Sequence, residues 1–369
     1  MMKLRVLLAG LLAVVSCSRE YDLPAGYDCF SVIAGKDATV DGCVYLAHNE
    51  DDGGEQMLNI YNLAATEDHL GALWFEFPGL PNADAYMNDH GVCVVTDRCR
   101  CREDESRAGT VQYEVRTAVG RHATTAREGV KIIGRMIEEY GYKDTGRSYM
   151  VADRNEGWVC SVVRGHHWVA QRVPDDAVMT IPNYYVIGRV DISDTVNFLG
   201  SADIVEYAME RGWYDPDRDG EFCFRDVYSD SATLVSNHNV SRQQMAQKYL
   251  FGNALSDGEV PFCRVPSEKI SVATLKGMLT TAPIKARSTV LSAVFVLDPS
   301  KPAGRGCSVW CGYPGMKPAD FEHWTLDRVS PSRYHRLENA EDALGRHFTD
   351  VENLRERYPD HFYWRYQSR

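Results

Sequence analysis

The clearest alternation of apolar and polar positions in the chain begins at Cys29. Apolar side chains recur from Phe30 to Ala34, Asp41-Gly42 has the composition of a tight turn, and an apolar, β-branched pattern resumes from Cys43 to Asn49. Alternation on both sides of an Asp-Gly turn predicts a β-hairpin. The hairpin starts with a cysteine and ends in His-Asn-Glu-Asp, which is an unusual arrangement. Taken alone, such a cysteine is most often a buried strand residue, and the upstream sequence changes this interpretation.

The remaining pattern predicts a mixed chain of helices and antiparallel strands. A Thr-x-x-Glu capping box at Thr125 and a stop at Gly141 bound one helix. Two further helices are expected at Arg242 to Phe251, with Ser241 as cap, and at Ser271 to Leu279. Strands are expected at Leu58 to Asn62, Ala72 to Phe77, Val92 to Thr96, Tyr149 to Ala152, Trp158 to Val163, His167 to Val173, Arg287 to Val296 and Gly306 to Gly312, with a polar turn at Pro81 to Tyr86. Consecutive strands without β–α–β alternation predict an α+β fold.

The first 28 residues do not fit a folded domain. Lys3 and Arg5 precede an apolar run from Val6 to Val15, which is too short to span a bilayer and matches a secretory signal peptide, residues 1–16. The signal ends just before Cys17, a pattern that resembles a bacterial lipoprotein signal. Residues 17–28 are polar and aperiodic, so they are either a propeptide or a lipoprotein tether. We therefore expect an exported protein, in the periplasm or anchored to a bacterial envelope membrane through Cys17.

Removal of a propeptide ending at residue 28 would give Cys29 a second chemical group. The new α-amine titrates at about 7.7–8.0, so it can act as a neutral base without help from burial. Beside a thiol, it can take the thiol proton and later return it to a leaving amine. Nucleophile and base would then belong to the same residue.

With these residues in place, the chain resembles a known family. Cys29, Gly35-Lys36, Ala38, Asp41-Gly42 and Ala47 to Asp51 are similar to the opening signature of the cysteine dipeptidases of the dipeptidase A type. Those enzymes are N-terminal-nucleophile hydrolases, related to secernins and to choloylglycine and penicillin V acylases. A second block, from Val173 to Asp194, also resembles the family. The resemblance implies a four-layer αββα sandwich of antiparallel sheets, formed by a single domain at residues 29–369 with a C-terminal helical tail.

The resemblance also implies roles for four catalytic residues. Cys29 would be the nucleophile, and Asp51 would orient its amine. Asn183 matches the asparagine that holds the reacting carbonyl oxygen, and a side-chain amide can donate to such an oxyanion. Arg242 matches an active-site arginine that stabilises charge. No asparagine occurs between Thr96 and Arg98, where related acylases place another oxyanion donor, so that role is not carried over.

His48 and Asn49 are the expected substrate-binding residues. The related acylases and many of the dipeptidases have arginine at the position of His48. A guanidinium is permanently charged and bidentate, whereas an imidazole is neutral for half of the time near pH ~6.5. The departure leaves the preferred substrate and the pH optimum open.

The composition excludes some classes of binding partner. The net charge of −12, without a basic stripe, argues against nucleic acid, and no apolar run after the signal approaches membrane-spanning length. No cofactor and no metal site are expected. The Cys99–Cys101 pair lacks a CxxC spacing and a nearby histidine, while a weak calcium-loop pattern from Asp215 to Asp226 is left open. Disulfide pairing among the nine cysteines other than Cys17 and Cys29, and formation of a homo-oligomer, are also left open.

The function expected from these residues is hydrolysis of dipeptides, small peptide substrates, through a Cys29 thiolate and a thioester. The first alternative is an N-acyl amide hydrolase of the choloylglycine or penicillin V acylase type, which uses the same chemistry with a more apolar pocket. The second is a non-catalytic surface lipoprotein or binding module in which Cys29 never becomes terminal.

Overall fold

The predicted hairpin lies at the centre of the fold. In this computed structural model, β1 (Asp28–Ala34) pairs antiparallel with β2 (Val44–Asp51). The turn between them contains Gly42 at a φ of 73°, a conformation that a side chain would strain. Each strand is also paired along its other edge, β1 with β10 (Val178–Ile181) and β2 with β12 (Thr289–Leu297). Cys29 therefore stands near the start of an interior strand.

The structure describes residues 28–51, 58–67, 69–76, 83–256, 259–326, 328 and 335–338. The expected signal peptide and all of the 17–28 segment except Asp28 lie outside the described residues, as does most of the C-terminal tail.

Two sheets make up the β-structure of the described residues. The six-stranded sheet has the order β10, β1, β2, β12, β13 (Cys307–Gly312) and β14 (Glu322–Thr325). The nine-stranded sheet has the order β11 (Phe198–Gly200), β9 (Trp168–Val173), β8 (Gly157–Val162), β7 (Arg147–Ala152), β6 (Cys93–Arg98), β5 (Ala83–Asn88), β4 (Ala72–Glu76), β3 (Leu58–Leu63) and β15 (His335–Glu338). Neighbouring strands are antiparallel, except that β15 runs parallel to β3.

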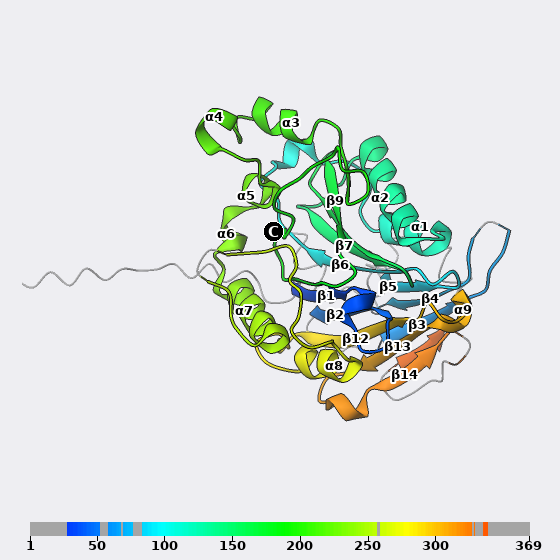
Figure 1. The fold of residues 1–369 in the computed structure, drawn as a ribbon. Helices are drawn as coiled ribbons and strands as arrows, with labels where there is room; N and C mark the ends of the chain where they lie inside the picture. Colours follow the sequence, from blue (N-terminus) through cyan, green and yellow to red (C-terminus); the bar gives the residue numbers. More distant parts are fainter. Residues whose placement is uncertain are drawn as a thin grey trace, which may run out of the picture.

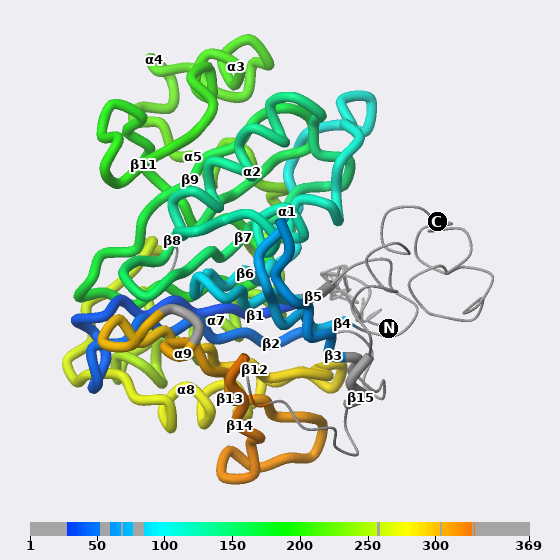
Figure 2. The backbone as a smooth tube through the Cα atoms, turned by 90° about the vertical axis from the view of Figure 1, so that its right-hand side faces the viewer, coloured from blue at the N-terminus to red at the C-terminus, as the bar shows by residue number. Residues whose placement is uncertain are grey.

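The two sheets face each other and helices cover their outer sides. One apolar core, which includes Ile33, Leu46 and Val95, fills the space between the sheets. A second core joins the nine-stranded sheet to α1 (Glu114–His122) and α2 (Ala126–Tyr140), and a third joins the six-stranded sheet to α7 (Asn237–Phe251) and α8 (Val272–Leu279). Figures 1 and 2 show the resulting stack of helix, sheet, sheet and helix layers. This arrangement confirms the predicted αββα sandwich.

Short helices connect the later elements. They are α3 (Ile204–Glu210), α4 (Pro216–Asp219), α5 (Phe224–Tyr228), α6 (Ser231–Leu234) and α9 (Ala303–Gly306), with single 3₁₀ turns at Lys36–Ala38, Glu105–Arg107 and Pro318–Asp320. No helix in the described part of the chain is both long enough and apolar enough to cross a bilayer.

Local signals predicted several boundaries well. The Thr125 hydroxyl accepts from the Glu128 N–H at the start of α2, and Gly141 ends that helix at a φ of 69°. Ser271 caps α8 through a capping box with Thr274. Because these signals depend on neighbouring residues alone, they can be read without knowledge of the fold.

Two predicted boundaries are wrong. The segment expected to be a turn at Pro81 to Tyr86 enters strand β5 at Ala83, because Ala85 and Tyr86 are buried on opposite faces of the sheet. The helix expected to start at Arg242, with Ser241 as its cap, starts five residues earlier, at Asn237. The Ser241 hydroxyl donates to the His238 carbonyl inside that helix, so it caps nothing.

The remaining cysteines and the acidic segment have structural explanations. Each cysteine from Cys43 to Cys311 carries a free thiol, so the structure contains no disulfide among them. Asp215 caps the short helix α4 by accepting from the Asp217 N–H, and Asp226 pairs with Arg225 at 2.7 Å. Asp215, Asp219 and Asp226 of the calcium-like pattern are therefore engaged in a helix cap and in arginine pairs.

Candidate active site

The β1–β2 register divides the polar residues of the hairpin between two faces. Cys29 is opposite Glu50 and Ser31 is opposite His48, so these four side chains share the face that looks toward the nine-stranded sheet. Asn49 and Asp51 point to the other face, toward α7 and α8. The cysteine is almost completely buried, with 3% of its surface exposed.

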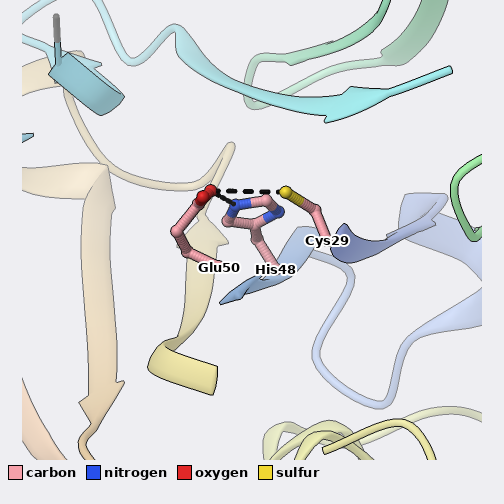
Figure 3. A group of neighbouring side chains, drawn as sticks. All are labelled: Cys29, His48 and Glu50. Carbon is pink, nitrogen blue, oxygen red and sulfur yellow. Dashed lines mark hydrogen bonds and ion pairs between the residues drawn. The ribbon is translucent and has the colours of Figure 1, made fainter. Parts of the chain in front are cut away.

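A chain of polar contacts runs from the Cys29 thiol into the space between the sheets. The thiol donates to Glu50 Oε2 at 3.4 Å, and His48 Nε2 lies 3.2 Å from the same oxygen (Figure 3). His48 Nδ1 lies 2.8 Å from Ser31 Oγ, and Ser31 in turn donates to Asp97 Oδ1 at 2.8 Å. Five residues from β1, β2 and β6 are thus joined in one buried network.

When Asp97 is ionised, the network places a proton on His48 Nδ1. An ionised Asp97 can only accept hydrogen bonds, so the Ser31 hydroxyl donates its proton to Asp97. The Ser31 oxygen then accepts from His48 Nδ1–H. The other ring nitrogen, His48 Nε2, faces Glu50 Oε2, which the thiol also contacts. Burial raises the pKa of Asp97, against the lowering effect of His48 and Ser31, which bond to it. The imidazole is held in one orientation by a carboxylate and a hydroxyl.

On the opposite side of Cys29, its backbone nitrogen contacts Asn183. Cys29 N donates to Asn183 Oδ1 at 3.1 Å, and Asn183 Nδ2 donates to the Arg98 carbonyl at 3.0 Å. The donor and the acceptor at the two ends fix which way the amide points. Because an amide nitrogen carries two hydrogens, Asn183 retains a second N–H for another acceptor.

Asp51 and Arg242 form a buried ion pair beneath this end of the hairpin. Arg242 Nη2 lies 2.7 Å from Asp51 Oδ2, and neither side chain is exposed. Thr289 donates to the second carboxylate oxygen at 2.5 Å. Arg242 Nη1 also donates to Asn183 Oδ1 at 3.4 Å. One guanidinium therefore connects the carboxylate to the amide that holds the nitrogen of Cys29.

Burial raises the pKa of Asp51 to about 6. Arg242 and the Thr289 hydrogen bond lower it, and the nearby carboxylate of Asp28, which is opposite Asp51 in the strand register, raises it further. The electrostatic state of Asp51 thus depends on whether residue 28 is present.

The structure brings together five of the six predicted site residues. Cys29, Asn183, Arg242 and Asp51 form one connected group, and His48 reaches the thiol through Glu50. Asn49 lies apart, since its amide donates to the Leu279 and Ile284 carbonyls at 2.9 and 3.4 Å on the helix-facing side. Its expected contact with substrate stays a prediction, and the structure does not place it with the thiol.

Three residues of the network were missed by sequence reasoning. Glu50 and Ser31 could have been found from the two-residue period of paired strands, which places them on the face of Cys29 and His48. Asp97 gave no local signal, because its contact with Ser31 spans 66 residues.

The layered sheets and the interior position of Cys29 define a class before any comparison is made. A cysteine at the start of a central strand, between the two sheets of an αββα sandwich, is the arrangement expected of an N-terminal-nucleophile hydrolase fold. The predicted fold class is therefore confirmed.

Comparison with known proteins identifies the family that the chain resembles. The profile of peptidase family C69 matches residues 103–282. A probable dipeptidase of Latilactobacillus sakei is 25% identical over 286 residues, which cover 68% of this chain and 59% of that protein. Dipeptidase A of Lactobacillus helveticus is 25% identical over 288 residues, 68% of this chain and 60% of its own. The chain is thus similar to proteins of the dipeptidase A type, as its residues indicated, and it spans about 60% of the length of these two relatives.

Among solved structures, an N-acylethanolamine-hydrolyzing acid amidase ortholog of Caenorhabditis elegans is similar at a TM-score of 0.41 with 13% identity. The match covers 80% of this chain and 99% of that one.

Proposed function

We propose that the mature protein is an exported cysteine dipeptidase that begins at Cys29. The dipeptidase relatives and the family C69 match support a peptide-bond hydrolase. The site supports a cysteine nucleophile, since the thiol, a carboxylate and an imidazole converge between the sheets. Export rests on the expected signal at residues 1–16, and anchoring through Cys17 would end when the chain is cut before Cys29.

Cleavage before Cys29 would change the charges at the site. It removes Asp28, whose carboxylate opposes Asp51 in the register, and leaves an α-amine on Cys29 in place of an amide. The amine would keep the Asn183 Oδ1 contact that the backbone nitrogen already makes. Asp51 would then balance an ammonium instead of repelling a carboxylate, so the cut both creates the base and removes an unfavourable charge.

The reaction would proceed through a thioester. The amine takes the Sγ proton, and the thiolate attacks the scissile carbonyl carbon. When the C–N bond breaks, the amine returns this proton to the leaving nitrogen, and the acyl group stays on sulfur. A water molecule, deprotonated by the same amine, then attacks the thioester; the C–S bond breaks, and the sulfur regains its proton. The second N–H of Asn183 would donate to the oxyanion in both steps.

The observation that favours a dipeptide is the position of Glu50. Its Oε2 lies 3.4 Å from the nucleophilic sulfur, and 15% of its side chain is exposed. In a dipeptide the α-nitrogen is about 2.5 Å from the scissile carbonyl carbon, and sulfur attacks that carbon from about 3–3.5 Å. A free α-ammonium would therefore come within reach of Glu50, where a charge-assisted hydrogen bond forms. An N-acyl group has no charge to offer there.

The test uses purified protein that starts at Cys29 and pairs of substrates that differ only at the amine. A panel of dipeptides is compared with the same dipeptides after N-acetylation and with acyl amides, and Cys29→Ser serves as the inactive control. Turnover of the free dipeptides that is much faster than that of their N-acetylated forms and of the acyl amides supports the proposal. Turnover of the acyl amides alone would instead identify an N-acyl amide hydrolase, and the absence of any turnover would favour a binding module.

A further inference from the structure

Three groups that can ligate a metal meet at the Cys29 thiol. Figure 3 shows Cys29, His48 and Glu50 pointing toward one another from paired strands. One ligand atom from each lies within 4.8 Å of the other two. The sulfur is 3.4 Å from Glu50 Oε2, and His48 Nε2 is 3.2 Å from the same oxygen.

Two of the three separations, from sulfur to oxygen and from nitrogen to oxygen, suit a tetrahedral zinc site. Zinc binds thiolate sulfur at about 2.3 Å and imidazole nitrogen or carboxylate oxygen at about 2.0–2.2 Å. At tetrahedral angles, ligand atoms at such bond lengths stand about 3.3–3.6 Å apart. The sulfur–oxygen and nitrogen–oxygen distances already fall at or near this range, so a metal could enter with little movement of the side chains.

The surroundings of His48 also suit a metal ligand. A ligating histidine usually donates its second ring N–H to a carboxylate or another acceptor, which fixes the ring and its tautomer. Here His48 Nδ1 contacts Ser31 Oγ at 2.8 Å, and Ser31 is bonded to the buried Asp97. With Nδ1 occupied by Ser31, the other ring nitrogen, Nε2, lies next to the Glu50 carboxylate.

We propose that Cys29, His48 and Glu50 form an inhibitory site for a thiophilic divalent cation of the zinc class. The metal binds Sγ, Nε2 and Oε2, and the thiol proton is released to solvent. The thiolate and the carboxylate neutralise its two positive charges, and the fourth position is left to water. Bound metal occupies the nucleophile and the carboxylate proposed for the substrate ammonium, so it competes with substrate.

The site does not depend on the proposed activity. None of its three ligand atoms is the backbone nitrogen of Cys29, so the uncut chain should bind the metal as well. Binding can therefore be measured on protein that has no activity.

The experiment titrates the purified full-length chain with Co²⁺, which replaces Zn²⁺ and gives a thiolate charge-transfer absorption when sulfur binds. Equilibrium dialysis gives the stoichiometry, and Zn²⁺ should displace the Co²⁺. We expect one Co²⁺ per chain with the thiolate band, and loss of that band in Cys29→Ser. The matched control is Cys223→Ser, a partly exposed thiol that has Asp226 beside it; this variant should retain the band.

Two further variants test the imidazole. His48→Gln should weaken binding more than 10-fold, and Ser31→Ala, which removes only the outer partner of the ring, should weaken it by about 10–100-fold. Circular dichroism checks that each variant is folded. If His48→Gln does not fold, the Co²⁺ affinity of Ser31→Ala tests the role of the imidazole. The proposal is overturned if the wild type gives no thiolate band, if the band survives Cys29→Ser, or if Ser31→Ala binds Co²⁺ as tightly as the wild type.

Discussion

The Arg242 guanidinium lies 2.7 Å from the Asp51 carboxylate, and both side chains are completely buried. The contact joins helix α7 to the end of strand β2, across 191 residues of sequence. The same guanidinium reaches Asn183 Oδ1, which accepts from the nitrogen of Cys29. The pair therefore connects the stability of the fold to the position of the Cys29 nitrogen, the group proposed to become the amine.

Replacement of Arg242 should destabilise the fold because it leaves the buried carboxylate of Asp51 without its positive partner. We expect Arg242→Met to lower the free energy of unfolding by about 3–5 kcal/mol, as measured by urea denaturation. The control is the double variant Arg242→Met, Asp51→Asn, in which neither charge remains. It should be clearly more stable than the single variant. Equal destabilisation in the two would show that the ion pair is not the source of the loss.

Asp51 should make the uncut chain less stable as the pH rises. Its folded pKa is raised to about 6 by burial, whereas an unfolded Asp titrates at about 3.9. The folded chain thus holds this proton more tightly, and the stabilisation is complete below about pH 4 and lost as the pH rises through about 6.

The measurement is the free energy of unfolding of wild type and Asp51→Asn from pH 4 to pH 7. Their difference should change by roughly 2–3 kcal/mol over this window. In a chain cut before Cys29 the change should shrink, because Asp28 no longer raises the pKa of Asp51. Parallel pH profiles for uncut wild type and Asp51→Asn would contradict the assignment.

What the sequence could predict depended on how local each signal was. The hairpin, its Asp-Gly turn and the cap of α2 at Thr125 follow from short patterns. The roles expected of Cys29 and Asn183 rest on the family resemblance. The contacts between them could not be predicted, because Cys29 and Asn183 are 154 residues apart and meet only when β10 joins β1.

Arg242 shows the limit most clearly. The sequence predicts Arg242 at the start of a helix, but the helix begins at Asn237. The first turns of this helix are mostly polar, so no apolar periodicity marks the start. The guanidinium consequently reaches Asp51 from the buried side of α7, not from its N-terminus. Tertiary packing decided this position, and periodicity over a few residues carries no information about it.

Asn183 is expected to act in two ways that two substitutions separate. Asn183→Ala removes both the acceptor for the Cys29 nitrogen and the N–H for the oxyanion, and should lower kcat by about 10²–10³-fold or more. Asn183→Asp keeps an acceptor oxygen and loses only the donors. If Asn183→Asp is as active as wild type in steady-state kinetics, the oxyanion role is wrong and only the orienting role remains.

Glu50 should determine the preference for a free α-amine. Glu50→Gln keeps the shape of the side chain but loses the charge, so kcat/KM for dipeptides should fall by about 10- to 100-fold, as expected for one charge-assisted hydrogen bond. Residual turnover of the N-acetylated dipeptides serves as the internal control and should not fall in parallel. A uniform loss on both substrate sets would show that Glu50 acts on the thiol and not on the substrate.

The central claim is that Cys29 becomes the N-terminal residue of the working enzyme. The most direct test is the intact mass of the active protein isolated from its native envelope, read together with its N-terminal sequence. The account predicts a chain that starts at Cys29, with residues 1–28 removed and the sulfur unmodified. An active chain that still carries residues before Cys29 would contradict it, because the cysteine would then have no α-amine to serve as its base.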